Sequence, residues 1–306
     1  MLLKKILRLS FKLLLATAIF MGLQKFCYQQ TRGFRPYWIL SNLPNDPRWE
    51  VPPLSEKEQK EIDALLDQPF TFLGCGGWTF AFLGQDKKTV LKFYRHTHLR
   101  PQEMLKDFSL KKLFLQSDPW PPNTGYFQEF NFKSCSLLYS LVKERTGILY
   151  VHINKTQGKH KPVTLYDNIG IRHTIDLDKT EFVVQKKAEL VFPHLEKLAK
   201  EKKFEEANHC VDEMFNCLLV LCKNGLRDCD RSMKNNFGYT EDGAVTLDLS
   251  SFIIDEELKN PGHYRKEIMY KTHKMAHILR KHYPSEISAH CEKRLCEILE
   301  KECSTL

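Results

Sequence analysis

The stretch Phe70-Thr-Phe-Leu-Gly74-Cys-Gly76-Gly77-Trp-Thr-Phe-Ala81-Phe-Leu-Gly84 places three closely spaced glycines between two runs of alternating apolar residues. This pattern predicts a strand, a glycine turn and a second strand. Glycines at such a turn let backbone N–H groups approach a phosphate, because no Cβ stands in the way. Glycine-rich hairpin turns are common, so Gly74, Gly76 and Gly77 become nucleotide-binding candidates only together with other phosphate-binding residues.

A short β run with one lysine comes next. Asp86-Lys-Lys88 is a turn signal, and Thr89-Val-Leu-Lys92-Phe-Tyr94 is an apolar strand pattern interrupted by Lys92. A lone strand lysine is usually an exposed one. Together, however, the glycine turn, the second strand and Val-Leu-Lys92 resemble the glycine-rich loop and third-strand lysine of protein kinases. The resemblance implies that Lys92 holds the α- and β-phosphates of ATP, although Thr79 stands where the family has its third glycine.

A second polar segment lies far downstream, after an apolar helical run. This run, His209–Lys223, ends at Asn224-Gly225, which is a good helix C-terminal signal. A polar loop comes after it, and Asp242-Gly243 between two short apolar runs predicts a tight hairpin turn. The sequence therefore predicts a helix, a polar loop and a β-hairpin, with Asp248 at the far end of the hairpin.

The acidic and amide side chains of this segment suit phosphoryl transfer. Asp230 could orient or deprotonate an attacking hydroxyl, while Asn235 and Asp248 offer hard oxygen ligands to Mg²⁺. The arrangement resembles the kinase catalytic loop, because Asp230 and Asn235 have the D-x-x-x-x-N spacing. Asp248 then falls about where that family has its D-F-G aspartate.

Two motifs depart from the family pattern. Asp228-Cys-Asp230 replaces H-R-D, and Asp248-Leu-Ser250 replaces D-F-G. Two assignments also stay open, since Asn236 could replace Asn235 as the ligand, and Arg227-Asp228 could be the R-D pair. Related small-molecule kinases tolerate such changes, and so do pseudokinases. The alternative is a polar turn whose Asp and Asn residues serve turn chemistry alone.

A kinase-like first lobe also needs a helix with a glutamate that pairs with Lys92. The candidates are Glu103 in Pro101–Gln116, and Glu129 and Glu144 in Phe127–Arg145. The second helix is preferred, because the strand-like run Ile148–Ile153 comes after it as a strand does in kinases. The choice between its two glutamates stays open, and a surface ion pair is the alternative for either.

Three further strand-like runs complete the expected first lobe. Val163–Asn168 and Ile171–Leu177 flank a turn, and Thr180–Leu190 contains Gln185. The resemblance implies that this last run leads into the hinge that binds adenine, so Gln185 is a nucleotide-binding candidate. The mostly helical chain after Phe252 has no A-P-E motif, which resembles lipopolysaccharide-sugar or aminoglycoside-type kinases more than full protein kinases.

We therefore expect an α+β, two-lobed, protein-kinase-like fold with an antiparallel β N-lobe and a small, mainly helical C-lobe. The expected parts are a membrane-targeting segment at 1–32, a linker at 33–53, an N-lobe at 54–190 and a C-lobe at 191–306. The linker assignment rests on its five prolines, at positions 36, 44, 47, 52 and 53.

The N-terminal 32 residues differ from the rest of the chain. Lys4, Lys5, Arg8 and Lys12 precede the uncharged run Leu13–Gln24. A signal anchor fits the charge bias, an interfacial amphipathic helix fits the interspersed basic residues, and a cleaved signal peptide fits Ala16-Thr-Ala18 as its cleavage site. We expect membrane association with the globular part in the cytoplasm.

Bulk composition narrows the function classes. The chain has 306 residues, 42% of them hydrophobic and 27% charged, with a net charge of +8, which indicates a globular protein. No zinc-finger spacing, RNA-binding signature or Arg-rich arm is visible, so nucleic-acid binding is not expected. The ten cysteines include no C-x-x-C pair. Four lie in or just after one apolar helix, which indicates free, mostly buried thiols in a reducing compartment.

The expected function is that of a membrane-associated, kinase-like protein that binds Mg-ATP and transfers a phosphoryl group to a hydroxyl acceptor. The acceptor could be a sugar, a lipid or a protein. The alternative is a pseudokinase that acts as a scaffold through protein–protein contacts without catalysis. The altered H-R-D and D-F-G positions and the missing third glycine motivate this alternative.

Overall fold

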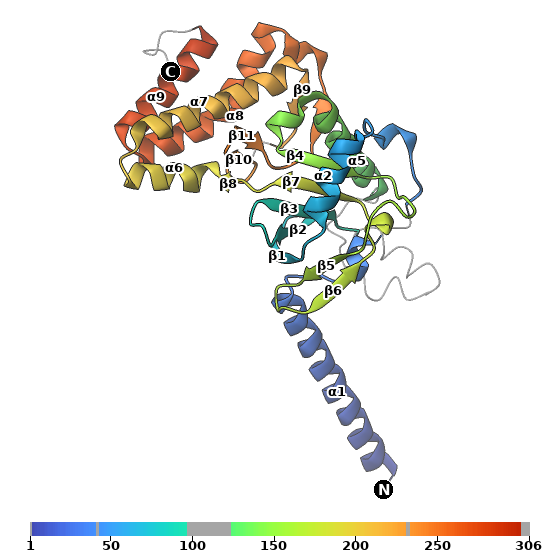
Figure 1. Cartoon of the computed structure of the whole chain (residues 1–306). Helices are drawn as coiled ribbons and strands as arrows, with labels where there is room; N and C mark the ends of the chain where they lie inside the picture. Colours follow the sequence, from blue (N-terminus) through green and yellow to red (C-terminus); the bar gives the residue numbers. More distant parts are fainter. Residues whose placement is uncertain (1, 41–42, 97–123, 231–232, 301–306) are drawn as a thin grey trace.

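The computed structural model describes residues 2–40, 43–96, 124–230 and 233–300. The chain folds into a sheet-rich lobe, a helical C-terminal lobe and an apolar N-terminal helix, which confirms the expected α+β, two-lobed class (Figure 1).

A seven-stranded sheet forms the first lobe, in the order β4-β7-β3-β2-β1-β5-β6. The strands are β1 (Phe70–Cys75), β2 (Thr79–Gly84), β3 (Thr89–Tyr94), β4 (Ile148–His152), β5 (Val163–Tyr166), β6 (Arg172–Ile175) and β7 (Phe182–Lys186). All neighbours pair antiparallel except β1 and β5, which are parallel. The first five strands in this order form the lobe that the kinase resemblance implies. The β5–β6 hairpin, expected at 163–177, extends the sheet beyond β1.

Two helices cover opposite faces of this sheet. The helix α2 (Glu56–Leu66) begins at a capping box made by Ser55 and Glu58, and it buries Ile62 and Leu66 against the sheet phenylalanines. The helix α5 (Thr124–Val142) lies between β3 and β4 in the chain and buries Phe132, Cys135 and Leu138 in the core shared with the C-terminal lobe.

The C-terminal lobe combines four helices with two small sheets. Its helices are α6 (Val191–Lys200), α7 (Phe204–Lys223), α8 (Pro261–His282) and α9 (Ser285–Leu299). Its strands are β8 (Glu189–Leu190), β9 (Leu226–Asp228), β10 (Phe237–Thr240), β11 (Gly243–Thr246) and β12 (Phe252–Ile254). The predicted Asp242-Gly243 hairpin joins β10 to β11, and β9 pairs with β12. The pairing of β9 with β12 brings the segment that contains Asp228 close to the segment that contains Asp248.

The segment predicted to be a linker packs against the first lobe. Phe34 is only 2% exposed, and its ring centroid lies 5.2 Å from that of Phe80 and 5.0 Å from that of Phe82. Trp49 is buried against Phe132 at 5.0 Å between centroids. The prolines begin two 3-10 turns, η1 (Pro36–Ile39) and η2 (Pro47–Trp49), rather than an extended tether. The prediction of an extended tether is therefore corrected. Prolines predict that regular secondary structure is interrupted, but the burial of aromatic side chains determines whether the segment packs against the lobe.

Other short 3-10 helices in the described chain lie in the connections between larger elements. They are η3 (Lys143–Arg145), η4 (Leu177–Lys179) and η5 (Glu256–Lys259).

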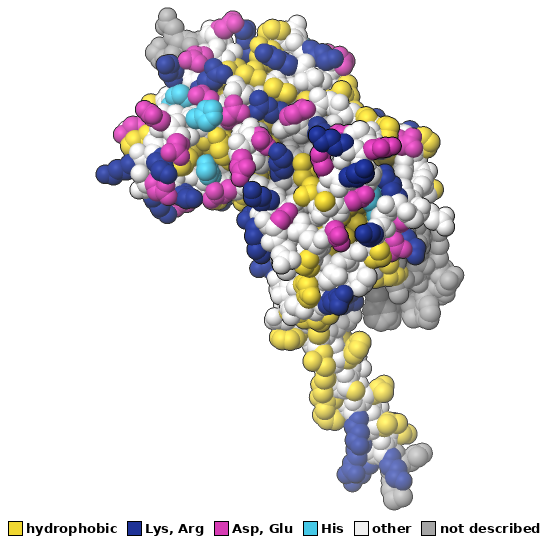
Figure 2. Space-filling view, viewed as in Figure 1, with side chains coloured by type: hydrophobic (Ala, Val, Ile, Leu, Met, Phe, Trp, Pro, Cys, Tyr) yellow, Lys and Arg dark blue, Asp and Glu magenta, His cyan; other side chains and the backbone are white. Residues whose placement is uncertain are grey.

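The N-terminal helix α1 (Leu2–Gln30) leads away from the two lobes (Figure 1). Among the described helices, one is long and apolar enough to cross a membrane, and it is Lys4–Gln30 of α1. A signal sequence can have the same length and composition. Figure 2 shows hydrophobic side chains along the helix and basic side chains at its N-terminal end. None of its side chains is buried from Lys4 to Gln30.

Three of the four cysteines expected in the apolar helical region are buried. Cys210, Cys217 and Cys222 lie in α7, while Cys229 lies in the loop after β9 and is exposed. The described cysteines are all free thiols. Cys210, Cys217 and Cys222 behave as small core residues, because burial raises the pKa of each thiol to about 12 and disfavours the reactive thiolate.

Candidate functional site

A cavity of about 460 Å³ lies between the two lobes. Its walls come from the β1–β2 turn, from β3 and β7, and from the loops on either side of the β10–β11 hairpin. The lining residues that the sequence singled out are Gly74, Gly76, Gly77, Lys92, Asn235, Asn236 and Asp248. Ser250, Trp78 and Tyr94 also line it. Segments more than 140 positions apart in the chain thus meet around one cavity, as the resemblance implies.

The glycine turn leaves open space over the cavity. A Cβ added at Gly74 or Gly77 would have no heavy atom within 4 Å, and one at Gly76 would meet only the Thr79 hydroxyl oxygen, at 4.0 Å. None of the three glycines has a positive φ. Neither a positive φ nor close packing therefore requires glycine at these positions, and the open space leaves the backbone accessible to a ligand. Arg95 steadies the turn by donating from a guanidinium nitrogen to the Gly76 carbonyl oxygen at 2.8 Å.

Lys92 points from β3 across the cavity toward the hairpin of the second lobe. Its Nζ donates to the Leu247 carbonyl oxygen at 2.9 Å, next to Asp248. Burial lowers the pKa of Lys92 to about 8, although the Asp248 carboxylate raises it in part. The lysine is therefore a poorly hydrated charge, which favours an interaction with an anion.

The predicted glutamate partner of Lys92 is not found among the described side chains. Glu144 lies in η3 and is exposed, away from the cavity. Glu103 and the side chain of Glu129 lie outside the described residues. The described part of α5 instead turns Cys135 toward Lys92, and burial raises the pKa of this thiol to about 12.

Ser134 connects α5 to the segment that carries Asp248. Its hydroxyl donates to the Leu249 carbonyl oxygen at 2.7 Å and accepts from the Phe252 backbone N–H at 2.9 Å. Ser134 is fully buried. The sequence patterns do not single out this residue, because a serine in a mixed helix carries no local signal of a contact with a segment 115 positions away.

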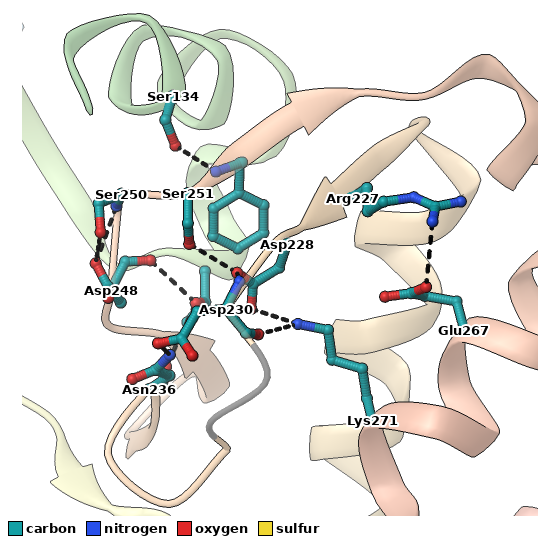
Figure 3. Close-up of polar contacts among 12 residues, drawn as sticks. Ser134, Arg227, Asp228, Asp230, Asn236, Asp248, Ser250, Ser251, Glu267 and Lys271 are labelled. Atoms are coloured by element: carbon teal, nitrogen blue, oxygen red, sulfur yellow. Dashed lines mark hydrogen bonds and ion pairs between the residues drawn. The ribbon is translucent and has the colours of Figure 1, made fainter. Parts of the chain in front are cut away.

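Asp230 lies in the loop after β9, next to Asn236 (Figure 3), and does not line the interlobe cavity. Its Oδ2 accepts a hydrogen bond of 2.8 Å from the Asn236 amide. This bond fixes the amide, so the Asn236 oxygen is the atom left for a ligand in the cavity. Asn235 also lines the cavity but is exposed, whereas Asn236 is 7% exposed.

Asp228 connects this loop to Ser251 and to Lys271. Its carboxylate accepts from Lys271 Nζ at 2.7 Å, from the Ser251 hydroxyl at 2.8 Å and from the Asp230 backbone N–H at 2.9 Å (Figure 3). Lys271, from α8, also donates to the Asp230 carbonyl oxygen. Arg227 forms ion pairs with Asp255 and Glu267 instead. Asp228 and Arg227 are therefore occupied by supporting contacts and do not line the interlobe cavity.

Asp248 presents one carboxylate oxygen to the cavity. Its Oδ1 accepts from the Ser250 backbone N–H at 2.9 Å and from the Ser250 hydroxyl at 2.6 Å (Figure 3). No hydrogen bond within the described chain engages Oδ2. This oxygen and the Asn236 amide oxygen are hard donors of the kind that Mg²⁺ prefers. The donor set, the open glycine turn and the adjacent Lys92 therefore fit a magnesium–polyphosphate ligand.

Gln185 does not line the cavity. It is 1% exposed, and its amide donates to the Thr146 carbonyl oxygen at 2.6 Å. Its neighbour Val183 lines the cavity instead. Side chains of a strand alternate between the two faces of the sheet, so Val183 and Gln185 share a face, and the end of β7 passes beyond the cavity.

A second cavity, of about 330 Å³, opens beside Asp230. Its walls come from the loop after β9, from α6 and from one face of α8. The lining residues are Phe192, Asp230, Met233, Lys234, Lys271, Lys274, Met275 and Ile278. Asp230 thus lines a smaller cavity with basic and apolar walls, while its hydrogen-bond partner Asn236 lines the interlobe cavity.

No protein-family model matches the chain, and no curated protein matches it in sequence. Among solved structures, the ternary complex of streptomycin, ATP and APH(2″)-IIa is similar to it with a TM-score of 0.28 and 11% identity. That match covers 83% of this chain and 99% of the other. A TM-score of this size is too low to support a statement about the function of this chain.

Proposed function

We propose that this chain is an ATP-dependent phosphotransferase that acts on a hydroxyl acceptor. The observation that carries the proposal is the convergence of the glycine turn, Lys92, Asn236 and Asp248 around one interlobe cavity. In this assignment Lys92 neutralises the phosphates, and Asp248 with Asn236 holds Mg²⁺. Asn235, which has the family spacing, is the alternative ligand. Positioning and charge neutralisation supply most of the catalysis in such sites.

Asp230 is assigned to the acceptor side. Its place in the wall of the smaller cavity lets a hydroxyl group enter from that cavity and meet the carboxylate, which would orient the hydroxyl or accept its proton. The lysines and apolar side chains of that cavity suit an acceptor that carries both negative charge and apolar surface. A membrane location through α1 belongs to the same proposal.

The test is thermal unfolding of the full chain in detergent, with and without Mg-ATP. At about a hundredfold excess over Kd, the ligand should stabilise the protein by ~2.7 kcal/mol. We expect the shift to need Mg²⁺ and to disappear in Lys92→Ala and Asp248→Ala. Lys88→Ala is the matched control, because this exposed lysine of the β2–β3 turn lies outside the cavity. No shift in the wild-type protein would reject the nucleotide site.

A pseudokinase is the second candidate. Two observations favour it: Lys92 contacts the Leu247 carbonyl with no glutamate partner among the described residues, and Asp228 is committed to Lys271. A Mg-ATP-dependent thermal shift without turnover of [γ-³²P]ATP, unaffected by Asp230→Asn, would favour the pseudokinase. Turnover that Asp230→Asn abolishes while the thermal shift persists would favour the phosphotransferase.

A further inference from the structure

A second cluster of ligand-type side chains lies outside both cavities, where the chain leaves β4. His152, His160 and Asp178 are buried, with exposures of 3%, 7% and 7%. One ligand atom from each lies within 4.8 Å of the others. His152 ends β4, His160 lies in the loop after it, and Asp178 lies in η4. Three separate segments therefore direct two imidazoles and one carboxylate to a common point.

The hydrogen bonds of His152 leave a lone pair at that point. Its Nδ1 lies 2.8 Å from the Thr180 carbonyl oxygen, which can only accept, so Nδ1 carries the proton. Burial lowers the pKa of His152, so the ring is neutral and Nε2 is an acceptor. Nε2 lies 3.1 Å from the Thr156 hydroxyl oxygen. That hydroxyl also contacts the Asp178 carboxylate, and its single hydrogen cannot serve both acceptors.

His160 presents a nitrogen that has no hydrogen-bond partner among the described residues. Its Nε2 lies 3.0 Å from the Tyr150 hydroxyl oxygen, while its Nδ1 is buried without a hydrogen bond. When Nε2–H donates to Tyr150, Nδ1 offers its lone pair. Burial lowers the pKa of His160 to about 4, so this ring is also neutral. The two rings meet edge to face, with centroids 5.0 Å apart.

The carboxylate of Asp178 is kept ionised. It accepts from the Lys159 backbone N–H at 3.1 Å and from the His160 backbone N–H at 3.2 Å. Together with the Thr156 hydroxyl, these donors lower the pKa of Asp178 despite its burial. Two neutral imidazoles and an ionised carboxylate are the protonation states in which these groups bind metal.

We propose that His152, His160 and Asp178 form a binding site for a divalent transition metal, with Zn²⁺ as the best match. Imidazole with carboxylate suits zinc, whereas Mg²⁺ and Ca²⁺ prefer sites made of oxygen atoms. The Thr180 carbonyl and the Tyr150 hydroxyl fix the imidazole orientations, as the outer partners of metal-bound histidines do. Because zinc–nitrogen bonds are ~2.0–2.1 Å long, the three side chains draw slightly closer when the ion binds.

The metal has a structural role and is separate from the proposed Mg²⁺ of phosphoryl transfer. Phe182 stacks on His152 at 4.8 Å, while its neighbour Val183 points to the opposite face of the sheet and lines the interlobe cavity. The ion would tie the loop after β4 and the η4 turn to the sheet. A cavity of about 330 Å³ that His160 and Gly158 line offers an entry path.

The test is Zn²⁺ binding to the untagged full chain, stripped with a chelator and titrated against a chromophoric competitor. We expect one high-affinity Zn²⁺ per chain, bound about 10–100-fold more weakly in Tyr150→Phe, which removes only the outer partner of His160. His160→Ala should lose the site. His194→Ala is the matched control, since His194 also pairs with a carboxylate, that of Glu189, at 3.0 Å but lies outside the cluster.

The proposal is overturned if stripped wild-type protein takes up no Zn²⁺, or if His160→Ala and His194→Ala bind it equally, which would indicate surface histidines. Co²⁺ gives a second readout. Its visible absorption in the wild-type protein should be that of a tetrahedral site and should change in Tyr150→Phe. An unchanged Co²⁺ spectrum also overturns the assignment. Neither readout depends on ATP or on phosphoryl transfer, so the result is independent of the proposed function.

Discussion

The buried ion pair between Lys271 and Asp228 holds the loop after β9 in place. Their side chains are only 4% and 10% exposed, and Lys271 also contacts the Asp230 carbonyl oxygen. Removing one partner of a buried pair leaves an uncompensated charge, which typically lowers stability by about 3–5 kcal/mol. The position of Asp230 therefore depends on Lys271, which lies outside the interlobe cavity.

We predict that Lys271→Met lowers the free energy of unfolding by about 3–5 kcal/mol at pH 7, and by less near pH 4. Burial raises the pKa of Asp228, so the folded state holds this proton more tightly than the unfolded state. The associated stability is present below the unfolded pKa and is lost as pH rises through the folded pKa. Removing Lys271 raises the folded pKa further. Urea unfolding at both pH values measures the effect.

The double variant Asp228→Asn/Lys271→Met is the control for this prediction, since it removes both charges together. It should recover much of the lost stability. Equal destabilisation by Lys271→Met at pH 4 and pH 7 would show that lost packing, rather than the buried carboxylate, is responsible.

Lys92 leads to a pH prediction for nucleotide binding. Its pKa is lowered to about 8 by burial, so above this pH the ligand-free protein loses the charge that would meet the phosphates. We expect Mg-ATP affinity to fall up to about tenfold between pH 7 and pH 9, one unit above the pKa. In Lys92→Arg the guanidinium stays charged, so its affinity, whatever its size, should be nearly independent of pH. Fluorescent-nucleotide titrations at several pH values compare the two, and parallel profiles would exclude Lys92 as the titrating group.

At the scale of elements, the approach of β10 to the segment between β7 and β8 positions the hairpin that carries Asp248. A Cβ on Gly238 would lie 2.6 Å from the Ala188 Cβ and 2.8 Å from the Leu247 Cδ1. Contacts this short force the two segments apart, which typically lowers stability by about 1–3 kcal/mol. The glycine turn between β1 and β2 is different, because a Cβ on Gly77 meets nothing within 4 Å.

We therefore predict opposite outcomes for two alanine substitutions. Gly238→Ala should lower the free energy of unfolding by about 1–3 kcal/mol, measured by urea denaturation. Gly77→Ala should leave the ligand-free stability nearly unchanged and reduce the thermal shift that Mg-ATP produces. A full Mg-ATP shift in Gly77→Ala would argue against a phosphate beside this turn.

The elements most readily predicted from the sequence were those with local signals. The glycine turn, the Lys92 strand and the Asp242-Gly243 hairpin were all predicted at their observed places. Gly74, Gly76, Gly77, Lys92, Asn235 and Asp248 meet at one cavity because the strand order is set by those turns. Local patterns say much less about support from distant segments. The contacts of Ser134 and Lys271 and the packing of Phe34 join residues that are far apart in the sequence, and local sequence spacing does not predict such contacts.

At the scale of the whole molecule, one hydrophobic core joins the lobes. It contains Phe132 of α5, Val183 of β7, Phe215 of α7 and Ile268 of α8. The interlobe cavity is therefore bounded by a continuous core rather than by two separate domains on a flexible joint. Ligand binding there should stabilise both lobes together, as a single unfolding transition.

The apolar helix α1 is long enough to be a membrane anchor or a signal sequence. It has no buried side chain from Lys4 to Gln30, so its apolar surface is not covered by the lobes and a membrane would cover it. Its C-terminal end contacts the folded part, since the Asn168 amide donates to the Gln30 carbonyl oxygen at 2.7 Å. A membrane at α1 would therefore hold the β5–β6 hairpin close to its surface.

We predict that the full chain fractionates with membranes and stays there after an alkaline carbonate wash, because a 27-residue apolar helix is long enough to span the bilayer. Deleting residues 1–24 should release the protein. The basic residues Lys4, Lys5, Arg8 and Lys12 would favour a cytoplasmic N-terminus, and a spanning α1 would then place the lobes on the opposite side of the membrane from the expected cytoplasmic location. Two outcomes contradict the anchor. Release by carbonate indicates an interfacial helix that lies in the headgroup layer, and an intact mass that begins after Ala18 indicates a cleaved signal peptide. A spanning helix with a cytoplasmic N-terminus and a cleaved signal peptide would both leave the lobes on the side of the membrane where ATP is scarce, and would favour the scaffold over the phosphotransferase. An interfacial helix would keep the lobes in the cytoplasm.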